Sequence, residues 1–377
     1  MKKERNSLIS SLLLSTLICG PVSADFKSAA KGLGFENLKI KLGAGYTDLA
    51  GSVDKAKLFS SKIGLETKAN LSNDIYFNLS LTLSSETGSS KAQYDQRRFT
   101  PKSRYSANYA YLSYNVLDLF DLNAGALDNK DQEATDNLIS SGASSMGVRE
   151  KVSFENEYLK LSAVATQASP YNDELSNRFD NVDEGEPKFF SEFVNVKFKL
   201  GTHSIDIKGA QYAYKNLSSS LAYNDRYYGN TVSGTSESNS VYVYGFKGRL
   251  LKAGATIAVG KDLKISPSMK QIKNNSATNG HNTGKVYALE ASTEILENKI
   301  TISLSDFSID SDTTVSYYNS SPYKNNYQGR TLELSIENPE HLTTTLSYVS
   351  REVKNPQFYL SDEKIITVNL RKSYDIL

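Results

Sequence analysis

The sequence predicts an all-β fold, a transmembrane antiparallel β-barrel of about sixteen strands. Three observations carry this prediction: alternating apolar and polar residues, connections that are alternately short and long, and a polar face too charged to be packed dry. The clearest alternation lies at odd positions of one segment, Ile75, Phe77, Leu79, Leu81 and Leu83. Side chains point to opposite faces of a strand with a period of two, so this strand has one apolar and one polar face.

The N-terminal residues 1–24 are typical of a cleavable signal peptide. Three basic residues precede the apolar run Leu8–Ile18, and small residues lead up to Ala24. The run is too short for a membrane helix of about 20 residues, although an N-terminal anchor is the alternative. Cleavage after Ala24 would also remove Cys19, the single cysteine of the chain, so we expect no disulfide or thiolate chemistry.

Residues 25–36 space their apolar side chains helically, and we expect a short periplasmic helix or an arm at the barrel mouth. The barrel is predicted over residues 37–377. Its sixteen alternating segments begin at Asn37, Lys62, Ile75, Tyr109, Phe120, Arg149, Tyr158, Phe193, Ser204, Val241, Asp262, Lys285, Lys299, Thr331, Leu342 and Lys364.

One segment is ambiguous, because its apolar parity changes between Val241 and Val259. Phe246 lies on one parity and Leu251 on the other. A bulge near Arg249–Leu250 would explain this within one strand, since a bulge shifts the facing by one residue. Two strands joined by a turn at Lys252–Gly254 would instead raise the count towards eighteen.

The connections between segments alternate between seven short links and eight long polar stretches, of which the first is "TDLAGSVDKAK" from Thr47. Outer-membrane barrels have this asymmetry, with short periplasmic turns and long external loops. The polar face carries residues such as Lys39, Lys41, Lys62, Lys68 and Glu66, which a dry core could not hold without unpaired charge. They suit a water-filled lumen, and lipid around the other face requires the sheet to close. A secreted soluble β-protein is the alternative.

These features resemble Gram-negative outer-membrane porins of the OprD-like and epsilonproteobacterial major outer-membrane type. The resemblance rests on the signal peptide, the strands, the loop alternation and "AYLSYNV" followed by "LNAGALD". The C-terminal "SYDIL" departs from it, because most such barrels end in an aromatic residue and this chain ends in Leu377. General porins form trimers and OprD-like porins act alone; we expect a homotrimer.

Several function classes find little support. The 43 basic and 42 acidic residues nearly cancel, so nothing attracts the chain to nucleic acid. Its three histidines fall in predicted turns and loops, away from a strand serine or carboxylate, and no metal, nucleotide or cofactor motif occurs. An acidic run at Asn181–Glu186 is better explained as a solvated loop than as a Ca²⁺ site. We therefore predict a protein that is not an enzyme and carries no cofactor or metal.

The predicted function is a water-filled channel in the cell outer membrane for passive diffusion of small hydrophilic solutes and ions. Its expected partners are those solutes, outer-membrane lipid and lipopolysaccharide. The alternative is a barrel that displays tyrosine-rich loops as an adhesin or surface receptor.

The loop over Asp128–Gly147 is predicted to fold into the lumen and form the constriction, as the loop after the fifth strand does in porin-like barrels. Its carboxylates would face a basic wall and set a transverse field that filters solutes by charge and size. The candidate constriction residues are Asp128, Asp131, Glu133, Asp136, Arg149, Lys151, Lys160, Lys197 and Lys199. We expect a weak preference for anions, unless the loop carboxylates dominate the narrowest point.

Overall fold

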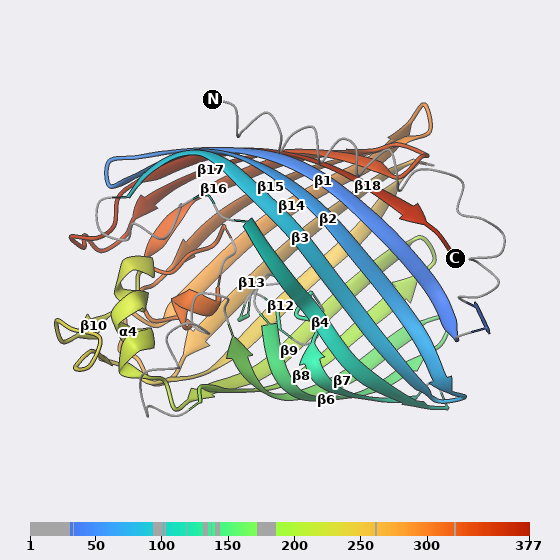
Figure 1. The fold of residues 1–377 in the computed structure, drawn as a ribbon, viewed down its shortest axis with the longest axis horizontal. Coiled ribbons are helices and arrows are strands. Elements are labelled where there is room, and N and C mark those ends of the chain that lie inside the picture. The colour runs from blue at the N-terminus through green and yellow to red at the C-terminus, as the bar shows by residue number, and fades with distance from the viewer. Residues whose placement is uncertain are drawn as a thin grey trace.

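The computed structural model describes residues 31–32, 34–92, 101, 103–117, 119–130, 135–136, 138–139, 144–171, 186–260, 262–319 and 322–377. The predicted signal peptide, the acidic run up to Gly185, and the basic residues Arg97, Arg98 and Lys102, for which the sequence predicts an external loop, lie outside them. Figure 1 shows an elongated barrel of tilted strands, with α4 (Ser219–Asp225) at one end and the C-terminus at the other. We call these the loop end and the turn end.

Sixteen strands close the barrel, as the sequence predicted, and the alternative count of eighteen is wrong. Every neighbouring pair is antiparallel, and β1 pairs with β18 to complete the ring. The strands are β1 (Phe35–Gly51), β2 (Asp54–Ser72), β3 (Ile75–Ala92), β4 (Ser103–Val116), β5 (Phe120–Leu127), β6 (Ser144–Glu155), β7 (Leu159–Tyr171), β8 (Lys188–Leu200), β9 (His203–Lys215), β12 (Phe246–Val259), β13 (Leu263–Asn274), β14 (Thr283–Ile295), β15 (Asn298–Ile309), β16 (Tyr327–Glu337), β17 (Leu342–Val353) and β18 (Glu363–Asp375).

A small hairpin of β10 (Val232–Ser233) and β11 (Val241–Tyr242) lies outside the ring, at the loop end. The short 3-10 helices η2 (Arg226–Tyr228) and η3 (Ser316–Tyr318) also belong to the connections at this end.

The first long external loop of the prediction is instead a tight hairpin. β1 and β2 stay paired as far as Ala50 and Lys55, which leaves a turn of only a few residues. β3 likewise extends to Ala92 and pairs with β2 throughout. The ladder can continue there because the extended backbone remains hydrogen-bonded beyond the apolar band, and the paired residues Leu49 and Ala56 are buried on its inner face, each 3% exposed.

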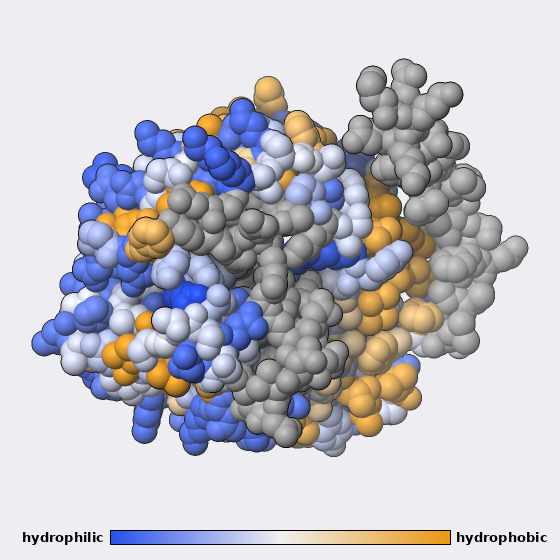
Figure 2. All heavy atoms as spheres, turned by 60° about the vertical axis from the view of Figure 1, so that its left-hand side comes forward, coloured by the Kyte–Doolittle hydropathy of each residue, from blue (hydrophilic) through white to orange (hydrophobic). Residues whose placement is uncertain are grey.

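The outer wall is apolar and follows the predicted parity. On β15 the outward Ile302 and Leu304 are 45% and 49% exposed, while the intervening Ser303 points into the barrel beside Glu290. Figure 2 shows hydrophobic side chains gathered on the barrel wall at the right and hydrophilic ones over the loop end. Among the described residues, no helix is long and apolar enough to cross a membrane.

The inside of the barrel becomes apolar towards the loop end, which the sequence did not predict. Phe246 and Leu250 point inwards and are each 2% exposed. They belong to a cluster of inward side chains and loop residues: Leu138, Ile139, Val164, Phe189, Phe193, Ala210, Tyr212, Tyr214, Leu221, Phe246, Leu250, Ile272, Val315, Tyr317 and Tyr318.

The predicted bulge near Arg249–Leu250 is wrong, and the inner cluster explains why. The pairings of β12 with β9 and with β13 run through Arg249 and Leu250 without a register shift. The change of apolar parity therefore has another cause: Phe246 and Leu250 face loops inside the barrel, whereas Leu251 and Ile257 face outwards.

Candidate functional site: a charged constriction inside the barrel

The loop between β5 and β6 enters the barrel. Leu138 and Ile139 are 0% and 2% exposed and lie in the inner cluster. The Tyr214 hydroxyl, on β9, donates a hydrogen bond to the Leu138 carbonyl oxygen at 2.5 Å. The ring of Tyr214 stacks on that of Tyr318 with centroids 6.1 Å apart, so a second loop holds the same position. Apolar packing and one buried hydrogen bond thus fix the part of the loop that follows Asp136.

Asp136 brings a carboxylate against three lysines of the inner wall. Its oxygens lie 3.3 Å from Lys208 Nζ, 3.4 Å from Lys270 Nζ and 4.0 Å from Lys252 Nζ. The lysines come from β9, β12 and β13, and they form one row because Lys252 pairs with Lys208 on one side and with Lys270 on the other. We call these four residues the lysine cluster.

The electrostatics of the cluster follow from this row. Like charges directly opposite each other destabilise a sheet, so three adjacent ammonium groups need a counter-charge. Burial would raise the pKa of Asp136, but the Lys270, Lys208 and Lys252 ammonium groups outweigh it and lower that pKa below its usual value. The carboxylate is therefore ionised, and the cluster keeps an excess of positive charge.

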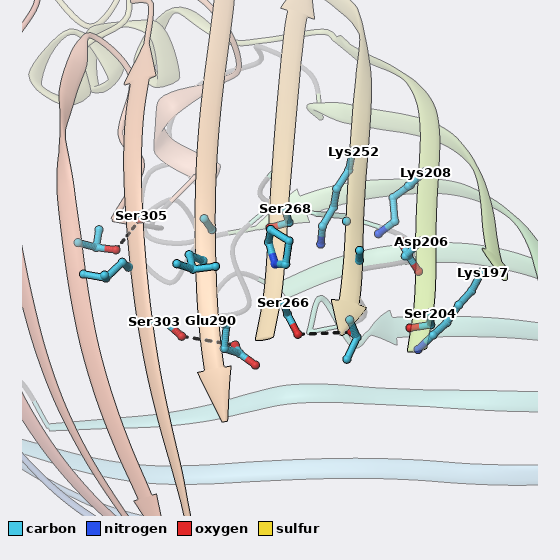
Figure 3. Close-up of a pocket in the computed structure, with 18 of the residues that line it drawn as sticks. Lys197, Ser204, Asp206, Lys208, Lys252, Ser266, Ser268, Glu290, Ser303 and Ser305 are labelled. Carbon is cyan, nitrogen blue, oxygen red and sulfur yellow. Dashed lines mark hydrogen bonds between the residues drawn. The ribbon is translucent and has the colours of Figure 1, made fainter. Parts of the chain in front are cut away.

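A cavity of about 470 Å³ adjoins the cluster on the inner wall. Figure 3 shows Lys197, Lys208 and Lys252 at one side of it, with Asp206 nearby and Glu290 on the other side. Serine hydroxyls fill much of the remaining lining, and Ser303 Oγ donates to Glu290 Oε2 at 3.4 Å. A wall of hydroxyl, ammonium and carboxylate groups can exchange hydrogen bonds with a hydrated solute.

The predicted constriction residues separate into groups. Asp136 lies in the lysine cluster, whereas Asp131 and Glu133 lie outside the described residues. Asp128 accepts at Oδ1 from the Lys130 backbone N–H at 2.9 Å, and its carbonyl oxygen accepts from Arg149 Nη1 at 2.9 Å. Arg149 is 4% exposed and so anchors the start of the loop.

The remaining predicted wall residues are less uniform. Lys160 and Lys199 lie near the turn end, where Glu155 binds them at 3.6 Å and 2.5 Å. Lys197 lines the cavity. Lys151 lies on the inner face of β6, two positions from Arg149. The structure thus places Asp136 and Lys197 near one region of the wall, and Lys160 and Lys199 below it.

Sequence reasoning missed Lys208, Lys252 and Lys270. All three occupy the polar parity of their strands, which is the only signal they carry in the sequence. Many lysines share that signal, and only the closed barrel shows which strands the β5–β6 loop reaches. Several other inner lysines are already paired: Lys39 with Asp375 at 3.2 Å, Lys68 with Glu36 at 3.0 Å, and Lys41 with Glu66.

The structure brings one histidine beside a serine and a carboxylate, which the sequence did not reveal. His281 Nδ1 lies 2.8 Å from Ser311 Oγ and 3.7 Å from Asp312 Oδ2. The arrangement differs from a catalytic triad, because the carboxylate and the imidazole share one serine hydroxyl and Asp312 does not orient the far nitrogen of His281. Ser311 is 1% exposed, so no substrate could reach it. Within the described ranges, no group of three His, Cys, Asp or Glu residues could hold a metal ion.

A buried acid lies at the loop end of the barrel. Asp225 ends α4 and is 0% exposed, and the Tyr242 hydroxyl donates a hydrogen bond to its Oδ2. Burial raises the pKa of Asp225 to about 8, against the opposing effect of that hydrogen bond. The acid is therefore protonated at neutral pH.

This raised pKa predicts that the segment around α4 and η2 loosens as the pH rises. The folded pKa lies above the usual value of an exposed aspartate, so the protonated acid stabilises this segment fully below about pH 4. As the pH rises from there to about 8, the equilibrium constant for opening of the segment should increase by up to roughly tenfold per pH unit. Hydrogen exchange of residues 219–228, corrected for intrinsic rates, should accelerate over this range. Asp225→Asn, which stays neutral, should remove the acceleration, and an unchanged pH dependence in that variant would contradict the assignment.

Comparison with known proteins places the fold. No model of a known protein family matches the sequence, and neither does any curated protein. Among solved structures, the high-pH structure of Pseudomonas putida OprB matches 92% of this chain and 96% of its own, with a TM-score of 0.59 and 12% identity. OmpT of Vibrio cholerae, with loop L8 deleted, matches 90% and 100%, with a TM-score of 0.54 and 9% identity. Salmonella typhi OmpF in complex with daunomycin matches 91% and 99%, with a TM-score of 0.52 and 9% identity. The shared feature is the barrel fold.

Proposed function

We propose that the chain is an outer-membrane porin, a water-filled channel through which small hydrophilic solutes and ions diffuse passively. The observation that carries this proposal is a closed sixteen-strand barrel whose outer wall is apolar and whose inner wall presents charged and hydroxyl side chains to a cavity. A barrel of this size leaves an aqueous interior, which eight strands would fill with side chains. The similar structures are of outer-membrane porins, which supports the same role and location.

The turn end would face the periplasm and the loop end the cell exterior, as in barrels of this class. Insertion of the purified chain into a planar bilayer tests the proposal. We expect stepwise conductance in the nanosiemens range, and silence in repeated insertions would contradict it. We assign no catalytic step to the chain.

Display of tyrosine-rich loops is the competing function, and their packing argues against it. Tyr317 and Tyr318, from the stretch "VSYYNSSPYKNNY", are 6% and 0% exposed and belong to the inner cluster. Tyr223 and Tyr227 stack around the Arg226 guanidinium, whose carbon lies 3.7 Å and 4.9 Å from their ring centroids. These rings pack against neighbouring groups of the loop-end connections and do not form an exposed binding surface.

The lysine cluster supports a preference for anions. Three ammonium groups face one carboxylate, and Lys252, whose side chain is 28% exposed, also lines the cavity together with Lys197. A positive excess beside the path of a solute raises the local concentration of anions.

Lys252→Glu should therefore shift the zero-current potential in a salt gradient towards cation selectivity. Lys364→Glu is the matched control, because Lys364 lies on the exposed outer face of β18 and its change should leave the potential unaltered. Equal shifts in both variants would mean that surface charge, and not the lumen, sets the selectivity.

The homotrimer stays a prediction, and one feature of the outer wall supports it. Glu150 points outwards from β6 only five positions from the turn-end residue Glu155, between Leu122 and Ala165 of the neighbouring strands. A carboxylate at this depth is unfavourable against hydrocarbon, whereas a subunit contact would cover it. The mass of the detergent-solubilised, unheated protein decides between trimer and monomer.

A further inference from the structure

The outer wall of β8–β14 carries a concentration of basic side chains just above its apolar band. Arg249, Lys273 and Lys285 each lie ten positions from the turn-end residue of their strand, and Lys188, Lys215 and Lys247 lie twelve positions away. A tilted strand crosses the hydrocarbon in about 9–11 residues. The six residues, which we call the basic belt, therefore lie at the outer edge of the apolar band.

The outward direction of the basic belt follows from parity and exposure. Arg249 and Lys247 share the parity of Leu251, which is 51% exposed, and Lys273 shares that of Met269, which is 44% exposed. Lys285 shares the parity of Leu289, which is 47% exposed. The belt thus sits directly above side chains that face the membrane interior.

The basic belt has almost no compensating charge. None of its six members forms an ion pair within the described part of the chain, and Lys215 instead lies 5.1 Å from the ring centroid of Phe190. Two acids flank it on this face: Glu192, two strands from Arg249 through Gln211, and Asp306, on the strand next to Lys285, which is already paired with Arg330. By contrast, some outward charges elsewhere are matched, as Arg330 is by Asp306 at 3.1 Å and Lys57 by Asp48 at 3.5 Å.

A groove runs through the belt. It has a volume of about 660 Å³ and is lined by Val194, Gly209 and Leu251 below and by Arg249 and Lys273 at its rim, with the one acid Glu192 beside them. No atom lies within 4 Å of the position that a Cβ of Gly209 would occupy, so the floor of the groove is open. A second groove of about 400 Å³ continues past Ala213 to Lys247. The surface therefore offers an apolar channel beneath a rim on which basic side chains outnumber the one acid, Glu192.

We propose that the basic belt binds the phosphorylated, multiply acylated glucosamine headgroup of lipopolysaccharide. The proposal rests on the outer-membrane location of the proposed function. Guanidinium and ammonium groups at the edge of the hydrocarbon bind lipid phosphates, and the groove over Gly209 accommodates an acyl chain or the edge of a sugar. Its occupant must be both anionic and acylated, because cationic and apolar surfaces adjoin in one groove.

Binding of purified lipid A to the full barrel in neutral detergent tests this site. Bisphosphorylated lipid A should bind more tightly than its dephosphorylated form, and added salt should weaken the difference. Each basic residue near an anionic headgroup contributes about fivefold. Lys247→Gln/Arg249→Gln/Lys273→Gln should therefore weaken binding on the order of a hundredfold.

The matched control removes the same charge elsewhere on the outer wall. Lys55, Lys57 and Lys91 are outward and exposed, but they lie 15 to 17 positions from the turn ends of β2 and β3, beyond the reach of a lipid phosphate. Their triple glutamine variant should bind lipid A like the wild type. Equal loss in both triple variants, no loss in the belt variant, or equal affinity for phosphatidylglycerol vesicles would overturn the proposal.

Conductance separates this inference from the proposed function. The belt residues face away from the lumen, so the belt variant should conduct like the wild type. A barrel that conducts but ignores lipid A would refute the site alone, whereas a barrel that binds lipid A without conducting would refute the channel.

Discussion

Asp136→Asn is expected to release the β5–β6 loop from the inner wall, with higher conductance and stronger anion selectivity. The substitution removes the negative charge that three lysines share, and the Lys208 and Lys270 side chains are only 4% and 10% exposed. Breaking a buried ion pair by removing one partner destabilises by about 3–5 kcal/mol, because the remaining charge is left uncompensated. Single-channel conductance and the zero-current potential report the two effects together.

Two further variants test whether the lost charge of Asp136 causes these effects. Asp206→Asn makes the same chemical change on the lumen side of β9, where Asp206 lines the cavity, and should leave the loop in place. Adding Lys208→Met to Asp136→Asn removes one unmatched ammonium group and should restore part of the wild-type conductance. A single Asp136→Asn variant that conducts and selects like the wild type would show that this loop is not the constriction.

Leu304→Lys should destabilise the barrel by about 2–4 kcal/mol, the cost of a cation near the bilayer midplane. Leu304 is 49% exposed on the outer wall, six positions from the turn-end residue Asn298. Denaturant unfolding in lipid vesicles measures the change. The expected effect is large because the new ammonium group has no water or counter-ion at that depth.

Ser303→Lys is the control for the opposite face of the same strand. Ser303 contacts Glu290 on the inner wall, so a lysine there gains a carboxylate and reaches water. Its unfolding free energy should stay close to that of the wild type. Equal destabilisation by the two lysines would contradict the assignment of the lipid and lumen faces.

Strand periodicity was sufficient to predict the closed barrel, the sixteen strands and the outward face, because these depend on local alternation. It was insufficient where an apolar residue meets a loop inside the barrel. The opposite parities of Phe246 and Leu251 looked like evidence of a bulge, since a sequence cannot distinguish a face covered by lipid from one covered by a folded loop. Ser80 is a second example. It lies on the polar face of its strand, which was predicted to meet water, but it is 3% exposed and accepts a hydrogen bond from Asn108 Nδ2 at 2.9 Å.

In the candidate site too, the sequence identified a residue from its local pattern but not the partners that the fold brings to it. Asp136 was identifiable as a loop carboxylate near the predicted constriction, and the structure places it in the lysine cluster. Its partners Lys208, Lys252 and Lys270 lie on three later strands, and their meeting depends on the curvature of the whole ring. The hairpin at Ala50 and Lys55 was missed because polar residues there suggested a loop, although the backbone ladder and the buried pair Leu49 and Ala56 continue the strands there.

The ladder between β1 and β18 has a kinetic consequence. It joins the first and last strands of the barrel over thirteen residue pairs, from Lys39 with Asp375 to Gly51 with Glu363. No closed state exists until β18 pairs with β1, so the ring cannot close before the last strand is present. Contacts between such distant segments form slowly, because a very long loop must close first. Until then β1 offers an unpaired edge on which other chains could polymerise.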